Sequence, residues 1–395
     1  MTLKMQLLPL LAMAAISTAA SAEWDIRGNV TGQAQYFTEN ANHTGDHKSN
    51  VSLSSEIELY QSLTDSTSIT VTPFFRIDQQ DEERTHFDFR EFLFHQVREN
   101  WEWKIGLGKV FWGVAESVNL IDVINQRDSV ENGDSSEKLG QAMINVFTSR
   151  EWGDVEFYIL PGFRERSFPG EDGRPRPSLV IDTNDARFES DDKEHHIDFA
   201  FRVSKTLGDW DVGLHAFTGT ARTPELVFNT NTGKLIPFYY QKNQVGIDAQ
   251  ATFESWLLKA EIIGITADRI ENHAELVTGF EYSFYGIAES DIDLGVVAEW
   301  LYDDRKNNNV PSTNPFQNDL LIGLRFALND EQSSDALLGV ITDLDGDGEI
   351  LSLEANRRIG SKVKASLDMR YWVNQPENSQ FANEDYLQLE LAYFF

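Results

Sequence analysis

The sequence predicts an all-β protein, a transmembrane antiparallel β-barrel of about 18 strands, within a range of roughly 16 to 20. Three observations favour this fold class. The N-terminus has the composition of an export signal, the last residues alternate as one strand that ends on an aromatic residue, and similar alternation recurs between the two ends. Apolar positions that repeat every second residue are typical of strands with two different faces.

The composition looks soluble at first sight. Hydrophobic residues make up 41% of the 395 residues, and mean hydropathy is −0.38. No apolar run beyond the N-terminus reaches the roughly 18 residues that a membrane helix needs. In a barrel, however, only alternate residues face lipid, so mean hydropathy stays low. The net charge of −31 argues against a nucleic-acid partner, and the absence of cysteine excludes disulfides and thiolate metal sites.

An export signal is predicted over residues 1–22. Lys4 supplies the positive charge, residues 7–16 are apolar, and Ala20-Ser21-Ala22 provides the small residues that a signal peptidase recognises. We expect cleavage after Ala22, which leaves residues 23–395 as a single outer-membrane barrel.

The first strand is expected over residues 24–36, where Trp24 and Ile26 share one face while Asp25 and Arg27 share the other. The first face suits lipid and the second suits a wet lumen. Later strands with the same alternation are expected within residues 197–203, 245–251, 292–300 and 361–373.

The C-terminal strand is the clearest of all. Leu387, Leu389, Leu391 and Tyr393 alternate with polar residues, and the chain ends on Phe395. This ending resembles the assembly signal of Gram-negative outer-membrane β-barrels. A soluble edge strand could end in the same way.

Short and long connections alternate along the chain, with long ones over residues 111–140, 164–195, 222–237 and 304–317. Both termini fall on the side of the short turns, so the long loops are expected to be external. About 18 strands enclose a lumen too wide for wall side chains to fill. A channel is therefore the default interpretation.

The third external loop is too apolar to extend into water. Val118, Ile121, Val123 and Ile124 could cover one side of a helical turn or two. We expect this loop to fold inward and to constrict the pore, with four charged residues near the narrowest point: Glu116, Asp122, Arg127 and Asp128. A packed plug or an external cap is the alternative.

The same block resembles a family of uncharacterised outer-membrane proteins of Gram-negative bacteria. The matching segments are Lys109-Val110-Phe111-Trp112-Gly113, Asp122-Val123-Ile124-Asn125-Gln126, Phe163-Arg164-Glu165-Arg166 and Asp303-Asp304-Arg305. The resemblance implies a porin-like barrel and no particular substrate. It also agrees with a third loop folded inside, as in porins.

Several basic residues are expected to line the lumen: Arg27, Arg76, Arg90, Lys104, Arg202, Arg325 and Arg370. Carboxylates at similar positions make this lining mixed, so strong anion selectivity is not expected. The opposed charges would create a transverse field across the pore. Alternatively, they would form interstrand salt bridges that stiffen the wall.

A possible calcium site lies at Asp343, Asp345 and Asp347, which have the spacing of an EF-hand loop. Glu354 occupies the twelfth position, but the flanking residues are predicted to be strands, which would point Glu354 into the lumen. An acidic hairpin tip is the alternative. No other cofactor is expected.

These features predict a non-enzymatic outer-membrane channel for passive diffusion of small hydrophilic solutes. The expected partners are those solutes, outer-membrane lipid and lipopolysaccharide, and a homo-oligomer is possible. The alternatives are a polysaccharide exporter, a structural barrel and an outer-membrane hydrolase. A hydrolase would need an ordered Ser/His/Asp motif, and none stands out in the sequence.

Overall fold

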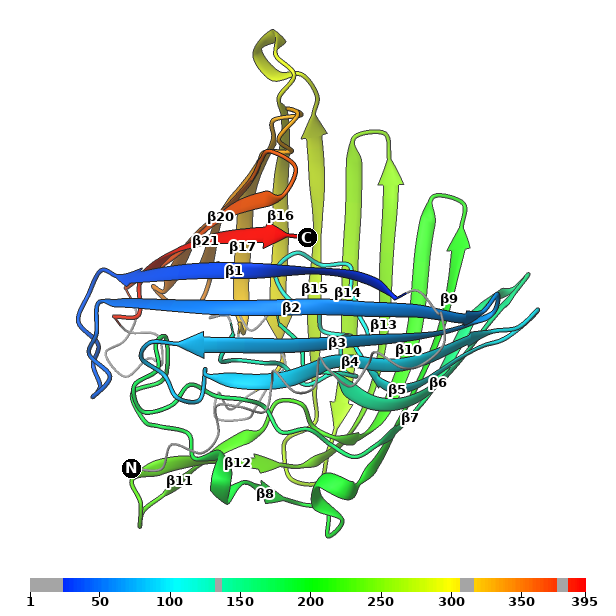
Figure 1. Cartoon of the computed structure of the whole chain (residues 1–395), viewed down its shortest axis with the longest axis horizontal. Coiled ribbons are helices and arrows are strands. Elements are labelled where there is room, and N and C mark those ends of the chain that lie inside the picture. The colour runs from blue at the N-terminus through cyan, green and yellow to red at the C-terminus, as the bar shows by residue number, and fades with distance from the viewer. Residues whose placement is uncertain (1–23, 132–136, 306–315, 375–382) are drawn as a thin grey trace.

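A closed barrel of 18 antiparallel strands forms the wall of the protein (Figure 1). The computed structural model describes residues 24–131, 137–305, 316–374 and 383–395, so the predicted signal peptide lies outside the described residues. Successive strands pair with each other, and β1 pairs with both β2 and β21, which closes the barrel. The predicted fold class is confirmed.

The wall strands fall into two halves along the chain. The first half consists of β1 (Asp25–Phe37), β2 (Ser49–Thr64), β3 (Thr67–Asp78), β4 (His86–Val97), β5 (Glu102–Gly108), β6 (Gln141–Arg150), β7 (Gly153–Pro161), β9 (Ile197–Leu207) and β10 (Trp210–Thr220). The second half consists of β13 (Gln241–Phe253), β14 (Trp256–Thr266), β15 (His273–Phe284), β16 (Asp293–Asp303), β17 (Asn318–Ala327), β18 (Asp335–Asp343), β19 (Glu349–Ile359), β20 (Val363–Val373) and β21 (Tyr386–Phe394).

Alternation fixes which face of each strand points inward. At the closure, Gln35 of β1 lies opposite Gln388 of β21, and their side chains form a hydrogen bond of 2.7 Å inside the barrel. Leu389 and Leu391 on the same strand are exposed on the outer face. A shift of one residue would exchange these faces, so the seam has a single favourable register.

The connections are asymmetric, as expected, with the long loops at the end of the barrel opposite the short turns. There β11 (Glu225–Asn229), β12 (Lys234–Tyr239) and β8 (Arg187–Phe188) form a small separate sheet below the wall in Figure 1. The segment expected as a plain loop over residues 222–237 therefore contains a hairpin.

Helix is confined to three short 3₁₀ segments in the described residues: η1 (Thr183–Asp185), η2 (Lys193–His195) and η3 (Ile287–Glu289). In the described part of the chain, no helix has the length and apolar character needed to cross a membrane.

Candidate functional site

Loop 3, which we define as residues 109–140, turns into the barrel between β5 and β6. Leu120, Ile121 and Ile124 are fully buried in it. They belong to one apolar cluster with inward-facing wall residues that include Met143, Leu160, Phe217, Val277, Leu301 and Leu321. Full burial of an aliphatic side chain contributes about 1.5–3 kcal/mol, so this cluster holds the loop strongly against strands β6 to β17.

Loop 3 contains no helix in its described residues, so the expected helical turns are wrong. A carboxylate explains the difference. Glu261 of β14 is fully buried, and it accepts hydrogen bonds from the backbone N–H groups of Val114 at 2.6 Å and Leu120 at 2.7 Å. It also accepts from Ala115 at 3.1 Å and Ile121 at 3.3 Å. Because the wall satisfies these donors, the loop does not need the hydrogen bonds of a helix.

A second buried carboxylate also holds loop 3 against the wall. Glu299 of β16 accepts from the backbone N–H groups of Glu116 at 2.7 Å and Ser117 at 2.8 Å, and from the Ser117 hydroxyl at 2.6 Å. The sequence predicts carboxylates in the lumen lining, but it did not identify Glu261 or Glu299 as residues that hold loop 3. The available signal was a carboxylate at an inward position between aliphatic residues, such as Val297 and Leu301 around Glu299.

Two of the four predicted constriction residues differ in exposure. Glu116 is partly exposed, and its carboxylate lies 2.7 Å from Arg325 and 3.7 Å from Lys259. Asp122 is buried and forms an ion pair with Lys138 within loop 3. Burial raises the pKa of Asp122, although Lys138 acts in the opposite direction, and burial lowers the pKa of Lys138.

The other two residues lie where the loop returns to the wall. Arg127 forms a β-bridge with Lys138. Asp128 is buried, with its carboxylate 2.7 Å from the Arg90 guanidinium and 2.5 Å from the Ser167 hydroxyl. Asp128 thus connects loop 3 to β4 and to the next external loop.

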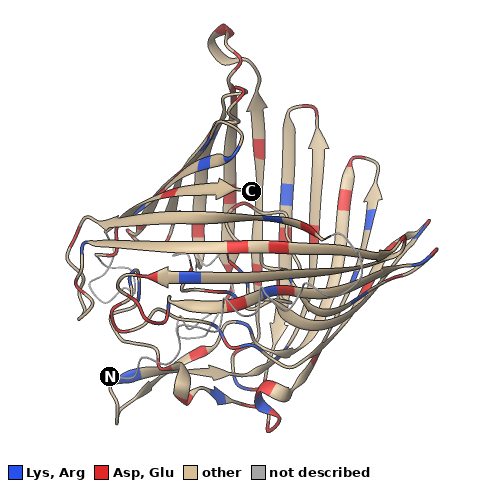
Figure 2. Cartoon of the chain, in the orientation of Figure 1, with Lys and Arg blue, Asp and Glu red and all other residues tan. Residues whose placement is uncertain are grey.

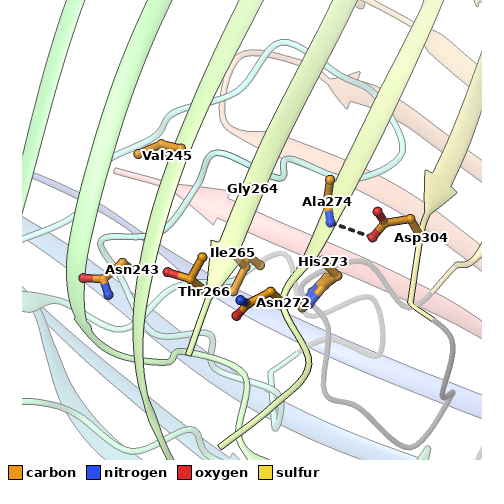
Figure 3. Close-up of a pocket in the computed structure, with 9 residues that line it drawn as sticks. All are labelled: Asn243, Val245, Gly264, Ile265, Thr266, Asn272, His273, Ala274 and Asp304. Atoms are coloured by element: carbon orange, nitrogen blue, oxygen red, sulfur yellow. Dashed lines mark hydrogen bonds between the residues drawn. The ribbon is translucent and has the colours of Figure 1, made fainter. Parts of the chain in front are cut away.

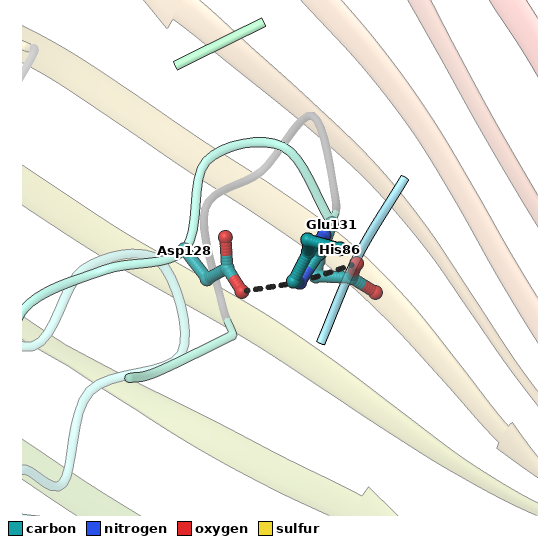
Figure 4. Close-up of side chains that lie close together, drawn as sticks. All are labelled: His86, Asp128 and Glu131. Carbon is teal, nitrogen blue, oxygen red and sulfur yellow. Dashed lines mark ion pairs between the residues drawn. The ribbon is translucent and has the colours of Figure 1, made fainter. Parts of the chain in front are cut away.

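Among the residues that the structure describes, two groups of side chains have the composition of a metal site: His86, Asp128 and Glu131 (Figure 4), and His273, Glu275 and Asp303. In the first group, Arg90 binds Asp128 and Arg76 binds Glu131 at 2.7 Å.

In the second group, Arg305 lies 2.6 Å from Asp303. Guanidinium groups already neutralise carboxylates in both groups, so the geometry favours ion pairing over metal binding.

The predicted basic residues point inward, and most form ion pairs. Arg27 pairs with Glu58 at 3.1 Å, Arg202 pairs with Asp248 at 2.7 Å, and Arg370 pairs with Glu354 at 2.5 Å. Lys104 lies between His95 of β4 and Asn145 of β6 in the register. The predicted basic residues of the lumen are therefore largely paired, as the salt-bridge alternative expects.

The acidic hairpin tip after β18 uses its first carboxylate in the turn. Asp343 Oδ1 accepts the backbone N–H groups of Asp345 at 2.9 Å and Gly346 at 3.1 Å. Asp345 accepts from Asn318 at 2.9 Å, while Glu354 faces the lumen and binds Arg370. Glu354 therefore does not contribute to a site at the tip.

A hollow of about 490 Å³ lies at the rim of the wall between β13, β14 and β15 (Figure 3). Val245, Gly264 and Ala274 line it, and Asp304 accepts a hydrogen bond of 2.7 Å from the Ala274 backbone N–H at its edge. Its lining also includes Ile265, which belongs to the apolar cluster of loop 3, and His273 of the second metal-like group.

The fold is that of Gram-negative outer-membrane porins. The chain is similar to a BenF-like porin from Pseudomonas fluorescens Pf-5, with a TM-score of 0.56 and 10% identity over 95% of this chain and 98% of that chain. It is similar to OpdO of Pseudomonas aeruginosa, with a TM-score of 0.55 and 9% identity over 94% and 96% of the two chains. For OccAB3 of Acinetobacter baumannii, the TM-score is 0.54 and the identity is 9%, over 94% and 99%.

At such identities the likeness concerns the fold alone. No family model matches the sequence, and no curated protein matches it either.

Proposed function

We propose that the protein is an outer-membrane channel for passive diffusion of small hydrophilic solutes and that it carries out no catalysis. The observation that carries this proposal is the position of loop 3. The loop is bound to the inner wall over strands β6 to β17, so it narrows a wide barrel from one side. Solutes would pass between this loop and the remaining wall, where polar and charged side chains face inward.

The fold shared with porins supports this proposal, and so does the outward apolar face of the strands. Both are expected of a barrel embedded in the outer membrane. Acidic external loops would then face the lipopolysaccharide layer.

The proposal is tested by adding the purified protein to planar lipid bilayers. We expect stepwise conductance increases for the wild type. Replacing Glu261 and Glu299 by alanine leaves the N–H groups of loop 3 without acceptors, at a cost of about 1–3 kcal/mol for each unsatisfied group. Loop 3 should then detach from the wall. The single-channel conductance should differ in magnitude from that of the wild type, or it should become less steady over time.

A matched control is Glu225→Ala, because Glu225 lies in the external hairpin β11 and pairs with Arg269. The control should conduct like the wild type. Correctly folded wild type that gives a flat trace would refute the channel. A conducting double variant with an unaltered trace would refute the role of loop 3 as a constriction.

A further inference from the structure

The apolar cluster of loop 3 covers only part of the inner wall. It packs on strands β6 to β17, whereas β1, β2, β21 and their neighbours contribute no residue to that cluster. The wall outside this cluster, which loop 3 reaches only at its polar ends, carries inward-facing carboxylates: Glu56 and Glu58 on β2, Glu91 on β4 and Glu390 on β21. Figure 2 shows the acidic bands on β2.

Three guanidinium groups that face the lumen are neutralised by carboxylates. Arg325 binds both Glu116 at 2.7 Å and Glu281 at 3.3 Å. Arg370 binds Glu354 at 2.5 Å and Asp368 at 2.7 Å, and Arg27 binds Glu58 at 3.1 Å. A guanidinium that is held between two carboxylates attracts a passing anion only weakly, because its charge is compensated locally.

Several carboxylates on the wall outside the apolar cluster form no ion pair with a guanidinium. In the described part of the chain, neither Glu56 nor Glu91 forms an ion pair. Lys109, the first residue of loop 3, lies beside Glu91 and offsets part of its charge, and Lys109 acts on Glu137 as well. Glu390 accepts hydrogen bonds from the neutral amides of Gln33 at 2.5 Å and Gln388 at 3.0 Å, so its charge is also uncancelled.

These carboxylates lie close to one level of the wall. Glu56 lies opposite Phe74, which lies opposite Asp88, and Glu91 lies opposite Thr72 on the same strand β3. Glu91 is within electrostatic range of both Glu56 and Glu58. Their negative charges therefore add up at one height of the pore.

We propose that the pore selects cations over anions, and that Glu56 and Glu91 set this preference. The inference rests on the proposed channel function and concerns the selectivity of permeation rather than a bound ion. A narrow passage with low-dielectric walls concentrates the field of fixed charges and enriches counter-ions along the path. Small cationic or zwitterionic solutes are then the favoured substrate class.

The test is the reversal potential of the wild-type channel under a KCl gradient. We expect the permeability ratio of K⁺ to Cl⁻ to be about 3 or higher at about 0.1 M salt, because a few uncompensated charges act at close range. The preference should weaken toward 1 M, where the Debye length falls from about 10 Å to about 3 Å. A reversal potential at zero, or of the sign expected for anions, would overturn the proposal.

Charge-changing variants locate the effect. Glu56→Gln with Glu91→Gln should move the reversal potential toward zero, whereas Glu56→Asp with Glu91→Asp should retain the cation preference. The matched control is Asp191→Asn with Asp192→Asn, two exposed carboxylates in an external loop, and it should behave like the wild type. An unchanged reversal potential in the Gln variant would refute the assignment to Glu56 and Glu91.

The two proposals fail in different ways. A folded protein without conductance refutes the channel itself. A conducting protein without cation preference refutes only this inference.

Discussion

Asp128 binds groups from three parts of the chain. Its carboxylate contacts Arg90 on β4 and Ser167 in the following external loop, and His86 lies 3.7 Å away (Figure 4). Burial alone would raise the pKa of Asp128, but the nearby His86 imidazole, the charge of Arg90 and the hydrogen bond from the Ser167 hydroxyl outweigh it. The pKa of Asp128 therefore lies well below its usual value of 3.8.

The stability of the protein should consequently depend on pH through this residue. Because the folded-state pKa is lowered, the ionised carboxylate stabilises the fold above about pH 4, and this stabilisation is lost as the pH falls further. The difference in unfolding free energy between the wild type and Asp128→Asn should shrink by about 1.4 kcal/mol per pH unit below that point. This difference in unfolding free energy is measured by monitoring the unfolding of both detergent-solubilised proteins with circular dichroism between pH 7 and pH 3.

Asp192→Asn is the control for this pH series, because Asp192 is exposed. It should match the wild type at every pH. A constant gap between the wild type and Asp128→Asn across the range would contradict the assignment of the acid sensitivity to Asp128.

Among the elements, the wall strands could be predicted from sequence and the inner loop could be predicted only in part. Alternation predicts strands because every second residue must face lipid, and the C-terminal strand β21 follows this rule with Leu389 and Leu391 outward. The apolar character of loop 3 predicted that it folds inward. Its conformation depends on Glu261 and Glu299, which lie far away in sequence, so local periodicity predicted helical turns that do not form.

The hairpin tip after β18 is the element where calcium binding stays a prediction. Asp343, Asp345 and Asp347 offer carboxylates, but Asp343 Oδ1 is already used by two backbone N–H groups. We expect weak binding, with a Kd of about 0.1–1 mM or weaker, as in open extracellular sites. Asp343→Asn with Asp345→Asn should abolish the heat of Ca²⁺ binding in calorimetry.

Glu354→Gln provides the matched comparison for the calcium measurement. Glu354 binds Arg370 in the lumen, so this variant should bind Ca²⁺ like the wild type. A loss of affinity in Glu354→Gln would show that the tip rearranges to recruit it. No measurable binding by the wild type would exclude the site.

At the scale of the whole molecule, loop 4 (residues 162–196) links two separate parts of the external rim. It leaves the wall after β7 and reaches the loops next to β1 and β21 through Arg174, whose side chain is completely buried. The guanidinium binds Glu384 at 3.1 Å and donates to the carbonyl oxygens of His47 at 2.8 Å and Asn383 at 2.7 Å. The guanidinium carbon Cζ of Arg174 also lies 4.1 Å from the centre of the Phe37 ring.

This contact predicts that loop 4 covers part of the external mouth. Arg174→Ala would leave Glu384 buried without its guanidinium partner and would free the carbonyl oxygens of two neighbouring loops, a loss of about 3–5 kcal/mol for a broken buried pair. Loop 4 should then become sensitive to limited proteolysis, and single-channel conductance should rise because the mouth widens. Arg187→Ala is the matched control, since Arg187 belongs to the same loop and is exposed. Proteolysis of loop 4 in Arg174→Ala without any rise in conductance would show that the loop lies beside the solute path and does not narrow it.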